Sequence, residues 1–235
     1  MFQNKFKDYF FIKTRLKRFW PLKIKLDEYS KIDKQSFQKK FFYRHSKLVA
    51  AALIGCYLIR NRQNQKPLKG IIVETEAYSQ EEEACHGFNK KTLSNKSLFG
   101  EPGIFYIYKS YGVHHCLNVV TDKKNFASGV LIRSVYLSDE NERVASGPGL
   151  VTKTFGVDLK FNSLKILEND FLYIKKGEKT FSKKDLVQTT RIGVSKAANL
   201  KWRWYLKNSR SISKREKGDR KPTIKTNNNK VLFKI

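Results

Sequence analysis

The chain has 235 residues, of which 40% are hydrophobic and 13% aromatic, so it is long enough to bury one good-sized core. Lysine and arginine number 48 against 21 aspartate and glutamate residues, which gives a net charge of +27 and a pI near 10. This composition argues against wholesale disorder. The charge favours a polyanionic partner, and nucleic acid fits it better than an anionic membrane surface.

Three cysteines, Cys56, Cys85 and Cys116, are too few and too odd in number for a disulfide framework, so they indicate a reducing compartment. The longest apolar run, residues 48–59, is about half of the roughly 20 residues that a membrane helix needs. Basic residues interrupt the N-terminus, so no signal peptide is expected there. A transit peptide is the alternative.

Composition divides the chain into three zones. Residues 1–35 form a basic N-terminal extension with aromatic side chains among eight Lys or Arg residues up to Lys25. Residues 36–208 have a globular composition, and residues 209–235 form a basic C-terminal tail with little apolar content before Val231. No internal repeat is present, so we expect one domain with two basic extensions.

Within the globular zone, Ser46 is expected to cap a helix over the apolar run, which ends at Gly55. Strands are predicted at 56–60 and 69–78, joined as a hairpin by turn-forming residues, and then at 104–108, 115–121 and 129–137. A short helix is expected from Gly147 to Phe155, followed by strands at 172–176 and 190–194. Because strands outnumber helices and short loops join several of them, we expect an α/β or α+β domain with a mostly antiparallel sheet.

The predicted strand 69–78, KGIIVETEAY, contains the most informative pattern. Side chains of a strand alternate between its faces, so Glu74, Glu76 and Tyr78 share one face, with about 7 Å between the two carboxylates. Like charges this close raise one pKa, which suits a general base. A solvated outer face with two ordinary glutamates is the alternative. Glu81, Glu82 and Glu83 extend the acidic patch, and we expect them to lie in an exposed loop.

Three tyrosines follow in FYIYKSYG. Tyr106 and Tyr108 share one strand face, and for both the alternative to a binding role is packing in the core. Tyr111 precedes Gly112, which predicts a turn with the tyrosine at its tip. An aromatic side chain there can stack on a base or insert between base pairs.

Arg133 alternates with Leu131 and Val135 on a predicted strand, so its face is otherwise apolar. A lone guanidinium in such a place is costly without a carboxylate partner, and Glu74 or Glu76 is the candidate. The alternative is an arginine that snorkels at a strand edge.

A metal site is a further alternative, because Cys85-His86 and His114-His115-Cys116 offer five ligand types. Adjacent ligands on a strand point to opposite faces, so the five cannot converge. The usual zinc, phosphate-loop, dinucleotide and serine-hydrolase motifs do not occur. We therefore expect no metal and no cofactor.

Six motifs then occur in one order. They are IIVETEAY, a His eight residues after its Tyr, KSLFGEPGIFYIYKSYGVHHCLNVV, VLIR, ASGPG and TTRIGVS. In the identity and order of these motifs, the sequence from about Ser36 to Ser213 resembles the alkyladenine (3-methyladenine) DNA glycosylase family. The resemblance implies a single mixed α/β domain with a curved, mostly antiparallel sheet and peripheral helices. It also implies a monofunctional DNA repair hydrolase that flips damaged purines out of duplex DNA and leaves an abasic site.

The resemblance also implies a role for each matching position. Glu76 matches the general base that activates water, Arg133 helps to hold that water, and the carbonyl of Ile192 is its third anchor. Tyr78, His86 and Tyr108 match the substrate-binding walls around the flipped base, and Asn118 matches the residue that excludes the 2-amino group of guanine. Tyr111 matches the DNA-binding wedge that fills the gap left in the duplex.

The sequence departs from the family pattern in three places. The interval between Tyr78 and His86 is one residue short, and Leu150 stands where relatives often carry Lys, so Lys153 is the expected phosphate contact. The run AANLKWRWYLK replaces a more usual W-x-x-K-P-x-R-F-Y.

The partner implied is damaged double-stranded DNA, bound by a monomer and with no membrane involved. We expect an intracellular location with DNA, either the bacterial cytoplasm and nucleoid or a eukaryotic nucleus or organelle. Two rival functions stay open: a non-catalytic nucleic-acid-binding module, and a metal-dependent nuclease that uses Glu74, Glu76 and the His and Cys residues.

Overall fold

The longest of the described strands, β2 (Leu68–Ser79), is the centre of the sheet in this computed structural model, which describes residues 37–219. One edge of β2 pairs with β5 (Ser128–Tyr136). The other edge pairs first with β1 (Tyr57–Arg60) and then, further along, with β8 (Arg203–Leu206). Strand β2 therefore changes neighbour halfway along one edge, and the two glutamates of interest lie in the half that meets β8.

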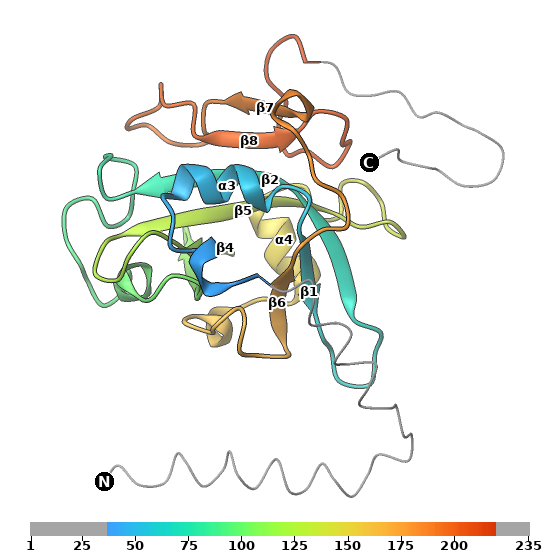
Figure 1. Ribbon diagram of the computed structural model, residues 1–235, viewed down its shortest axis with the longest axis horizontal. Coiled ribbons are helices and arrows are strands. Elements are labelled where there is room, and N and C mark those ends of the chain that lie inside the picture. Colours follow the sequence, from blue (N-terminus) through green and yellow to red (C-terminus); the bar gives the residue numbers. More distant parts are fainter. Residues whose placement is uncertain (1–36, 220–235) are drawn as a thin grey trace, which may run out of the picture. The chain divides into compact units, whose positions relative to one another are not determined.

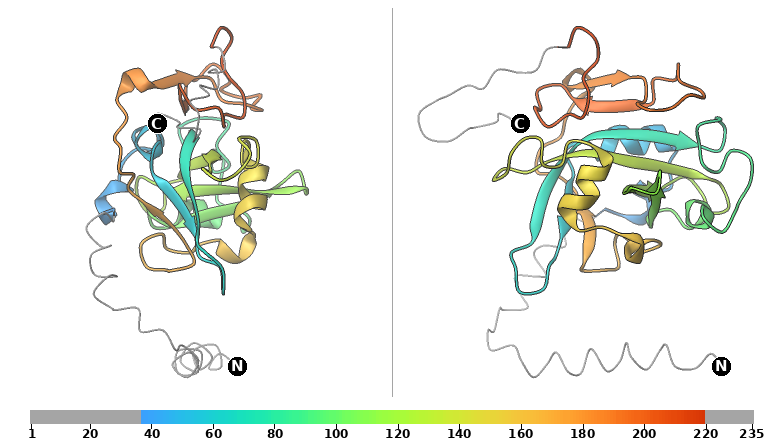
Figure 2. Two further views of the ribbon diagram at one scale, coloured as in Figure 1. Left: turned by 90° about the vertical axis from the view of Figure 1, so that its right-hand side faces the viewer. Right: turned by 180° about the vertical axis from the view of Figure 1, so that it is seen from behind.

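The remaining strands complete an eight-stranded sheet among the described residues, in the order β3-β4-β5-β2-β1-β6, with β7 paired to β8. These strands are β3 (Phe105–Ser110), β4 (His114–Val120), β6 (Leu172–Lys175) and β7 (Leu186–Thr189). All of the pairs are antiparallel, and the sheet is strongly curved (Figures 1 and 2). This confirms the prediction of a mixed α/β domain around a curved antiparallel sheet.

Within residues 37–219, two helices pack on the sheet. Helix α3 (Ser46–Leu53) lies against β2 and buries Val49, Ala50 and Leu53, while α4 (Pro148–Phe155) lies against β4 and β5. Ser46 is the first residue of α3 rather than its cap, because the side chain of His45 accepts the hydrogen bond from the Lys47 amide. Four short 3-10 turns connect the elements: Lys39–Phe41, Lys96–Phe99, Leu159–Phe161 and Lys183–Asp185.

Two bulges interrupt the pairing of β2 with β5 at mid-length. Val73 is the extra residue on β2 and Arg133 is the extra residue on β5, since the successive partners are Ile72–Val135, Glu74–Ser134 and Thr75–Ile132. A bulge breaks the simple alternation of faces and re-aims side chains. The prediction that Arg133 shares its face with Leu131 and Val135 is therefore wrong in part, because Val135 lies in the core. Ser134 instead lies on the same side as Arg133, where its hydroxyl donates to Glu74.

The strand predicted at 190–194 is also wrong. Strand β7 ends at Thr189, and the next residues form a loop in which Gly193 has a positive φ of 73°. The irregular backbone leaves the Ile192 amide free to bond a side chain instead of a neighbouring strand. Strand β8, which the sequence analysis does not predict, supplies the neighbour of β2 at the site.

Residues 209–219, the first part of the segment read as a basic tail, are bonded to the body of the domain. The amide of Ser213 donates to Glu74, Arg203 donates to the carbonyl of Lys214, and Tyr205 donates to Asp219. Residues 1–36 and 220–235, which hold the N-terminal extension and the end of the tail, lie outside the described residues. Across 37–219, no helix is both long and apolar enough to cross a membrane.

Candidate active site

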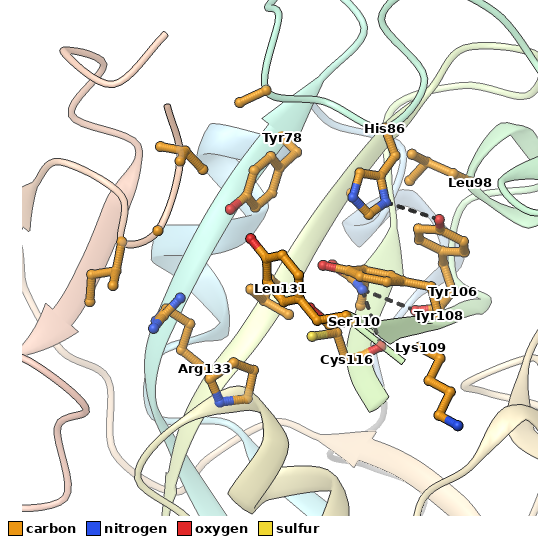
Figure 3. A pocket seen from close by; sticks show the side chains of 18 of the residues that line it. Tyr78, His86, Leu98, Tyr106, Tyr108, Lys109, Ser110, Cys116, Leu131 and Arg133 are labelled. Atoms are coloured by element: carbon orange, nitrogen blue, oxygen red, sulfur yellow. Dashed lines mark hydrogen bonds between the residues drawn. The ribbon is translucent and has the colours of Figure 1, made fainter. Parts of the chain in front are cut away.

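A cavity of about 610 Å³ is lined by side chains from strands β2, β3, β4 and β5. Figure 3 shows its side chains, with Tyr78 and His86 at one end and Arg133 near the other. Loop residues 192–196 and Pro148 complete the wall. The lining includes six of the seven predicted site residues: Tyr78, His86, Tyr108, Asn118, Arg133 and Tyr111. The seventh, Glu76, lies directly behind them.

Glu76 is fully buried and accepts hydrogen bonds from three parts of the fold. Arg133 Nη1 on β5 lies 3.2 Å from its Oε2, and the Tyr78 hydroxyl lies 2.9 Å from the same oxygen. The amide of Ile192 donates to Oε1 at 2.8 Å. All three of these donors belong to residues that line the cavity. They fix the orientation of the carboxylate directly behind the cavity lining.

Glu74 is equally buried, but its surroundings enclose it more completely. Ser134 Oγ and the Ser213 amide donate to its Oε2 at 2.7 and 2.8 Å. Arg203 Nη1 and Ser213 Oγ donate to Oε1 at 2.8 and 3.0 Å. Four donors occupy the carboxylate, so Glu74 serves as the buried counter-ion of the arginines around it. The alternative of a solvated outer face is wrong for both glutamates, whose exposed fractions are 0%.

Arg133 bridges the two carboxylates. Its Nη1 contacts Glu76, and its Nε lies 3.7 Å from Glu74 Oε1. The predicted carboxylate partnership is confirmed. Burial alone would lower the pKa of Arg133, but the charges of Glu76 and Glu74 outweigh burial and raise that pKa. The guanidinium therefore stays charged and faces the cavity beside Glu76.

Aromatic rings form the walls of the cavity. The rings of His86 and Tyr108 contact each other at 4.3 Å with an angle of 71°, so they make one continuous surface. His86 Nδ1 and the Tyr106 hydroxyl are hydrogen-bonded at 3.2 Å (Figure 3). Tyr106 is 3% exposed and belongs to the small core cluster behind the wall, as the core reading predicts. Tyr78 stands on a different strand and forms a second surface.

The walls carry no charge at neutral pH. Burial raises the pKa of Tyr78, and the nearby carboxylate of Glu76 raises it further. Burial likewise raises the pKa of Tyr108. The ring of His86 is exposed at the cavity edge, yet the side chains around it desolvate it enough to lower its pKa. A cationic ligand between these rings would therefore meet electron-rich faces that carry no positive charge of their own.

Asn118 lies on the floor of the cavity, buried on β4. Its Nδ2 donates to the carbonyls of Tyr106 and Cys116, at 3.2 and 3.3 Å. Because these bonds commit the amide nitrogen to the backbone, the side chain presents a fixed shape to anything that enters.

Tyr111 stands at the tip of the β3–β4 hairpin, with a positive φ of 49° and an exposed fraction of 90%. Val113 beside it is 79% exposed. The predicted position at a turn tip is confirmed. Two large apolar side chains at a solvent-exposed tip next to a cavity suit contact with a partner.

Sequence reasoning missed one pair of residues at the site. Arg191 and Glu82 form a two-pronged ion pair, with distances of 2.7 and 2.8 Å, and their exposed fractions are both 6%. The exposed loop expected for Glu82 is therefore wrong, although Glu81 and Glu83 are exposed. The two partners lie 109 residues apart, and no local pattern marks either of them.

The candidate metal ligands do not gather. Within residues 37–219, no group of three or more His, Cys, Asp or Glu side chains is placed to hold a metal ion. His86 instead faces Tyr106 and Tyr108, and Cys116 lines the cavity. At the second departure from the family pattern, Leu150 on α4 is 40% exposed, and Lys153 lies exposed one turn further on.

The site thus combines a buried carboxylate, an arginine that holds it and a cavity lined by aromatic rings. Comparison with known proteins gives the class. A family model described as methylpurine-DNA glycosylase matches residues 40–210. The chain belongs to the methylpurine-DNA glycosylase family, whose members are hydrolases of N-glycosidic bonds in DNA.

Individual relatives agree. A protein of Trichodesmium erythraeum named "Putative 3-methyladenine DNA glycosylase" is 39% identical over 188 residues, covering 73% of this chain and 94% of the relative. A protein of the same name from Carboxydothermus hydrogenoformans is 40% identical over 189 residues, covering 75% and 98%. A third, from Synechococcus elongatus, is 37% identical over 168 residues, covering 72% and 86%. The predicted family is confirmed.

Proposed function

We propose that the protein removes alkylated purines, with 3-methyladenine as the type substrate, from duplex DNA by hydrolysis of the N-glycosidic bond. The observation that carries this proposal is the placement of Glu76. Its carboxylate is held by Arg133, Tyr78 and Ile192 at the edge of a cavity whose walls are neutral aromatic rings. Family membership supplies the substrate class, and the geometry supplies a role for each side chain.

In this mechanism the damaged base leaves the stack and enters the cavity. Unstacking costs a few kcal/mol, and stacking on aromatic side chains returns about 1–3 kcal/mol per base. Tyr78 forms one wall, while His86 and Tyr108, which contact each other, form the other. An alkylated purine is cationic, so the tyrosine faces add a cation–π attraction that an undamaged base lacks. Asn118 limits the space on the floor and discriminates against the 2-amino group of guanine.

Glu76 then acts as the general base. A water between Glu76, Arg133 and the carbonyl of Ile192 loses a proton to the carboxylate as its oxygen bonds to C1′ of the deoxyribose. The bond from C1′ to the purine nitrogen breaks, and its electron pair neutralises the positive charge of the base. The products are free base and an abasic site. No further acid is needed, because a cationic purine is already a good leaving group.

The remaining roles concern DNA. Tyr111 at the exposed hairpin tip fills the gap that the flipped nucleotide leaves, and Lys153 contacts a phosphate. The protein acts as a monomer on double-stranded DNA. Residues 1–35 and 220–235 are basic extensions that hold DNA without contacting the lesion. Of the two rival functions, a binding-only module gives no role to the buried pair of Glu76 and Arg133.

The test is release of free base from methylated duplex DNA in the presence of EDTA. We expect methylated purines in the supernatant and abasic sites in the DNA, at the same rate with and without the chelator. A metal-dependent nuclease would lose activity in EDTA and would cut the backbone. Binding without base release would support the non-catalytic module and overturn the proposal.

A further inference from the structure

We infer that Arg191 is a positioning residue for the reaction, which holds two of the three donors of Glu76 in place. The inference rests on the proposed function of Glu76. Arg191 does not line the cavity, and its guanidinium is buried behind the aromatic wall. The proposed mechanism gives this buried guanidinium no role, although it lies next to two residues that bond to Glu76.

The first donor is the hydroxyl of Tyr78. The guanidinium carbon of Arg191 lies 4.7 Å from the centre of the Tyr78 ring. Because Tyr78 lines the cavity and Arg191 does not, the guanidinium covers the face of the ring away from the cavity. A cation over an aromatic face attracts it and restricts its rotation. The ring so held places its hydroxyl 2.9 Å from Glu76 Oε2.

The second donor is the amide of Ile192, the next residue along the chain. It lies 2.8 Å from Glu76 Oε1. Arg191 fixes the loop that carries this amide, because its Nη1 donates to the Ala77 carbonyl on β2 at 3.0 Å. Its Nη2 donates to the Ala197 carbonyl at 3.2 Å at the far end of the loop. A single side chain thus ties the loop 190–197 to the strand that bears the carboxylate.

Glu82 extends the same arrangement to the opposite wall. Its two oxygens pair with both terminal nitrogens of Arg191, and its Oε2 also accepts from the Ala84 amide. Ala84 lies two residues before His86, so the ion pair connects the turn that presents His86 to the ring of Tyr78. A bidentate pair of this kind fixes direction as well as distance, which a lysine cannot do.

The experiment compares Arg191→Lys, which keeps the charge but loses the two-pronged geometry, with Arg210→Lys as a matched control. Arg210 likewise pairs with a glutamate, Glu142, and it does not line the cavity. The readout is the single-turnover rate of base release from methylated duplex DNA at saturating protein. Because misplacement of catalytic groups by about 1 Å costs up to about 10²-fold, we expect Arg191→Lys to slow release by 10- to 100-fold. Arg210→Lys should change the rate by less than about twofold.

A double-mutant cycle separates positioning from general destabilisation. If Arg191 acts through Tyr78, the Arg191→Lys substitution should cost at least about threefold less in a Tyr78→Phe background, where the hydroxyl is already absent. If Arg191→Lys and Tyr78→Phe slow base release by factors that simply multiply in the double variant, the inference is overturned. Equal losses of rate in Arg191→Lys and Arg210→Lys would also overturn it. If Arg191→Lys does not fold, Glu82→Gln tests the same connection, and full activity of that folded variant would also overturn it.

A measurement that needs no activity keeps this inference distinct from the proposed function. In a crystal structure of Arg191→Lys, the Tyr78 hydroxyl should lie beyond hydrogen-bond distance of Glu76. An unchanged 2.9 Å contact would sink the inference whatever the enzyme does. If wild-type protein releases no base, the proposed function fails, and the crystal structure still decides whether Arg191 positions Tyr78.

Discussion

Glu74 and Glu76 lie two residues apart on β2 and are equally buried, but they differ in what their carboxylates face. Four donors from Ser134, Arg203 and Ser213 enclose Glu74. The donors of Glu76 include Tyr78 and Arg133, which line the cavity themselves. Glu74 is thus enclosed by the fold, whereas Glu76 is held by residues that face the cavity. The two should respond differently to the same substitution.

Glu76→Gln should abolish base release and leave lesion binding intact. The amide keeps the shape of the side chain but cannot take a proton from water, and loss of a general base costs about 10²–10⁴-fold. Single-turnover release and binding to methylated duplex DNA measure the two properties. Glu140→Gln, at an exposed position, is the control. Full activity of Glu76→Gln would refute the assignment.

Glu74→Gln should mainly weaken the fold. The substitution removes the carboxylate that pairs with Arg203 and leaves Arg133 with Glu76 alone, and breaking a buried ion pair costs about 3–5 kcal/mol. We expect a lower urea midpoint with an unchanged slope. Base release per folded molecule should fall less than in Glu76→Gln. An unfolding free energy equal to that of wild type would contradict the role as counter-ion.

Tyr111→Ser should reduce binding and base release on duplex DNA more than on single-stranded DNA. The exposed ring fills the vacated stack only where a stack exists. Affinities measured for both forms of the same methylated oligonucleotide test this. Val113→Ser, two residues along the same tip, shows whether apolar surface alone suffices. Equal losses on both substrates would mean that Tyr111 does not act as a wedge.

The stability of the protein should depend on pH through His86. Desolvation lowers the pKa of this ring below its ordinary value of about 6.5. Below about pH 6.5 the unfolded chain therefore binds a proton that the folded chain does not, so the unfolding free energy falls as pH decreases. Urea titrations at several pH values measure this slope. His86→Gln should flatten it. An unchanged slope in His86→Gln would assign the effect to other groups.

Deletion of residues 1–35 and 220–235 should weaken binding to undamaged DNA without slowing single-turnover chemistry. These segments carry eight Lys or Arg residues up to Lys25 and five from Arg220 onward. Each phosphate neutralised contributes about −0.9 to the slope of log K against log salt, so loss of roughly five contacts flattens the slope by about 4–5 units. Binding titrations across a salt series provide the measurement. An unaltered slope would mean that the segments serve another partner.

The features of the site that could be predicted depend only on local geometry or on a single buried charge. Period-two alternation placed Glu74, Glu76 and Tyr78 on one face, and the cost of a lone buried charge predicted the pairing of Arg133. The hairpin tip of Tyr111 followed from the glycine after it. Each of these inferences needs only local geometry and the energetics of a single charge.

What could not be predicted depends on pairings distant in sequence. Opposed bulges at Val73 and Arg133 change which side chains share a face, and no residue type signals them. Ser213 reaches Glu74 across 139 positions, and Arg191 reaches Glu82 across 109. The basic character of the segment after residue 208 suggested a tail, although Ile212 packs in the hydrophobic core and Ser213 bonds to Glu74.

The bonds of Ser213 to Glu74 also order the assembly of the protein in time. A nascent chain can pair β1, β2 and β5 while residues beyond 137 are still being synthesised, but Glu74 then lacks both donors from Ser213 and the charge of Arg203. The buried carboxylate is satisfied only when the chain has grown past residue 213. A fragment of the chain that ends before Ser213 should therefore lack a working catalytic centre, because Glu74 loses both of these donors.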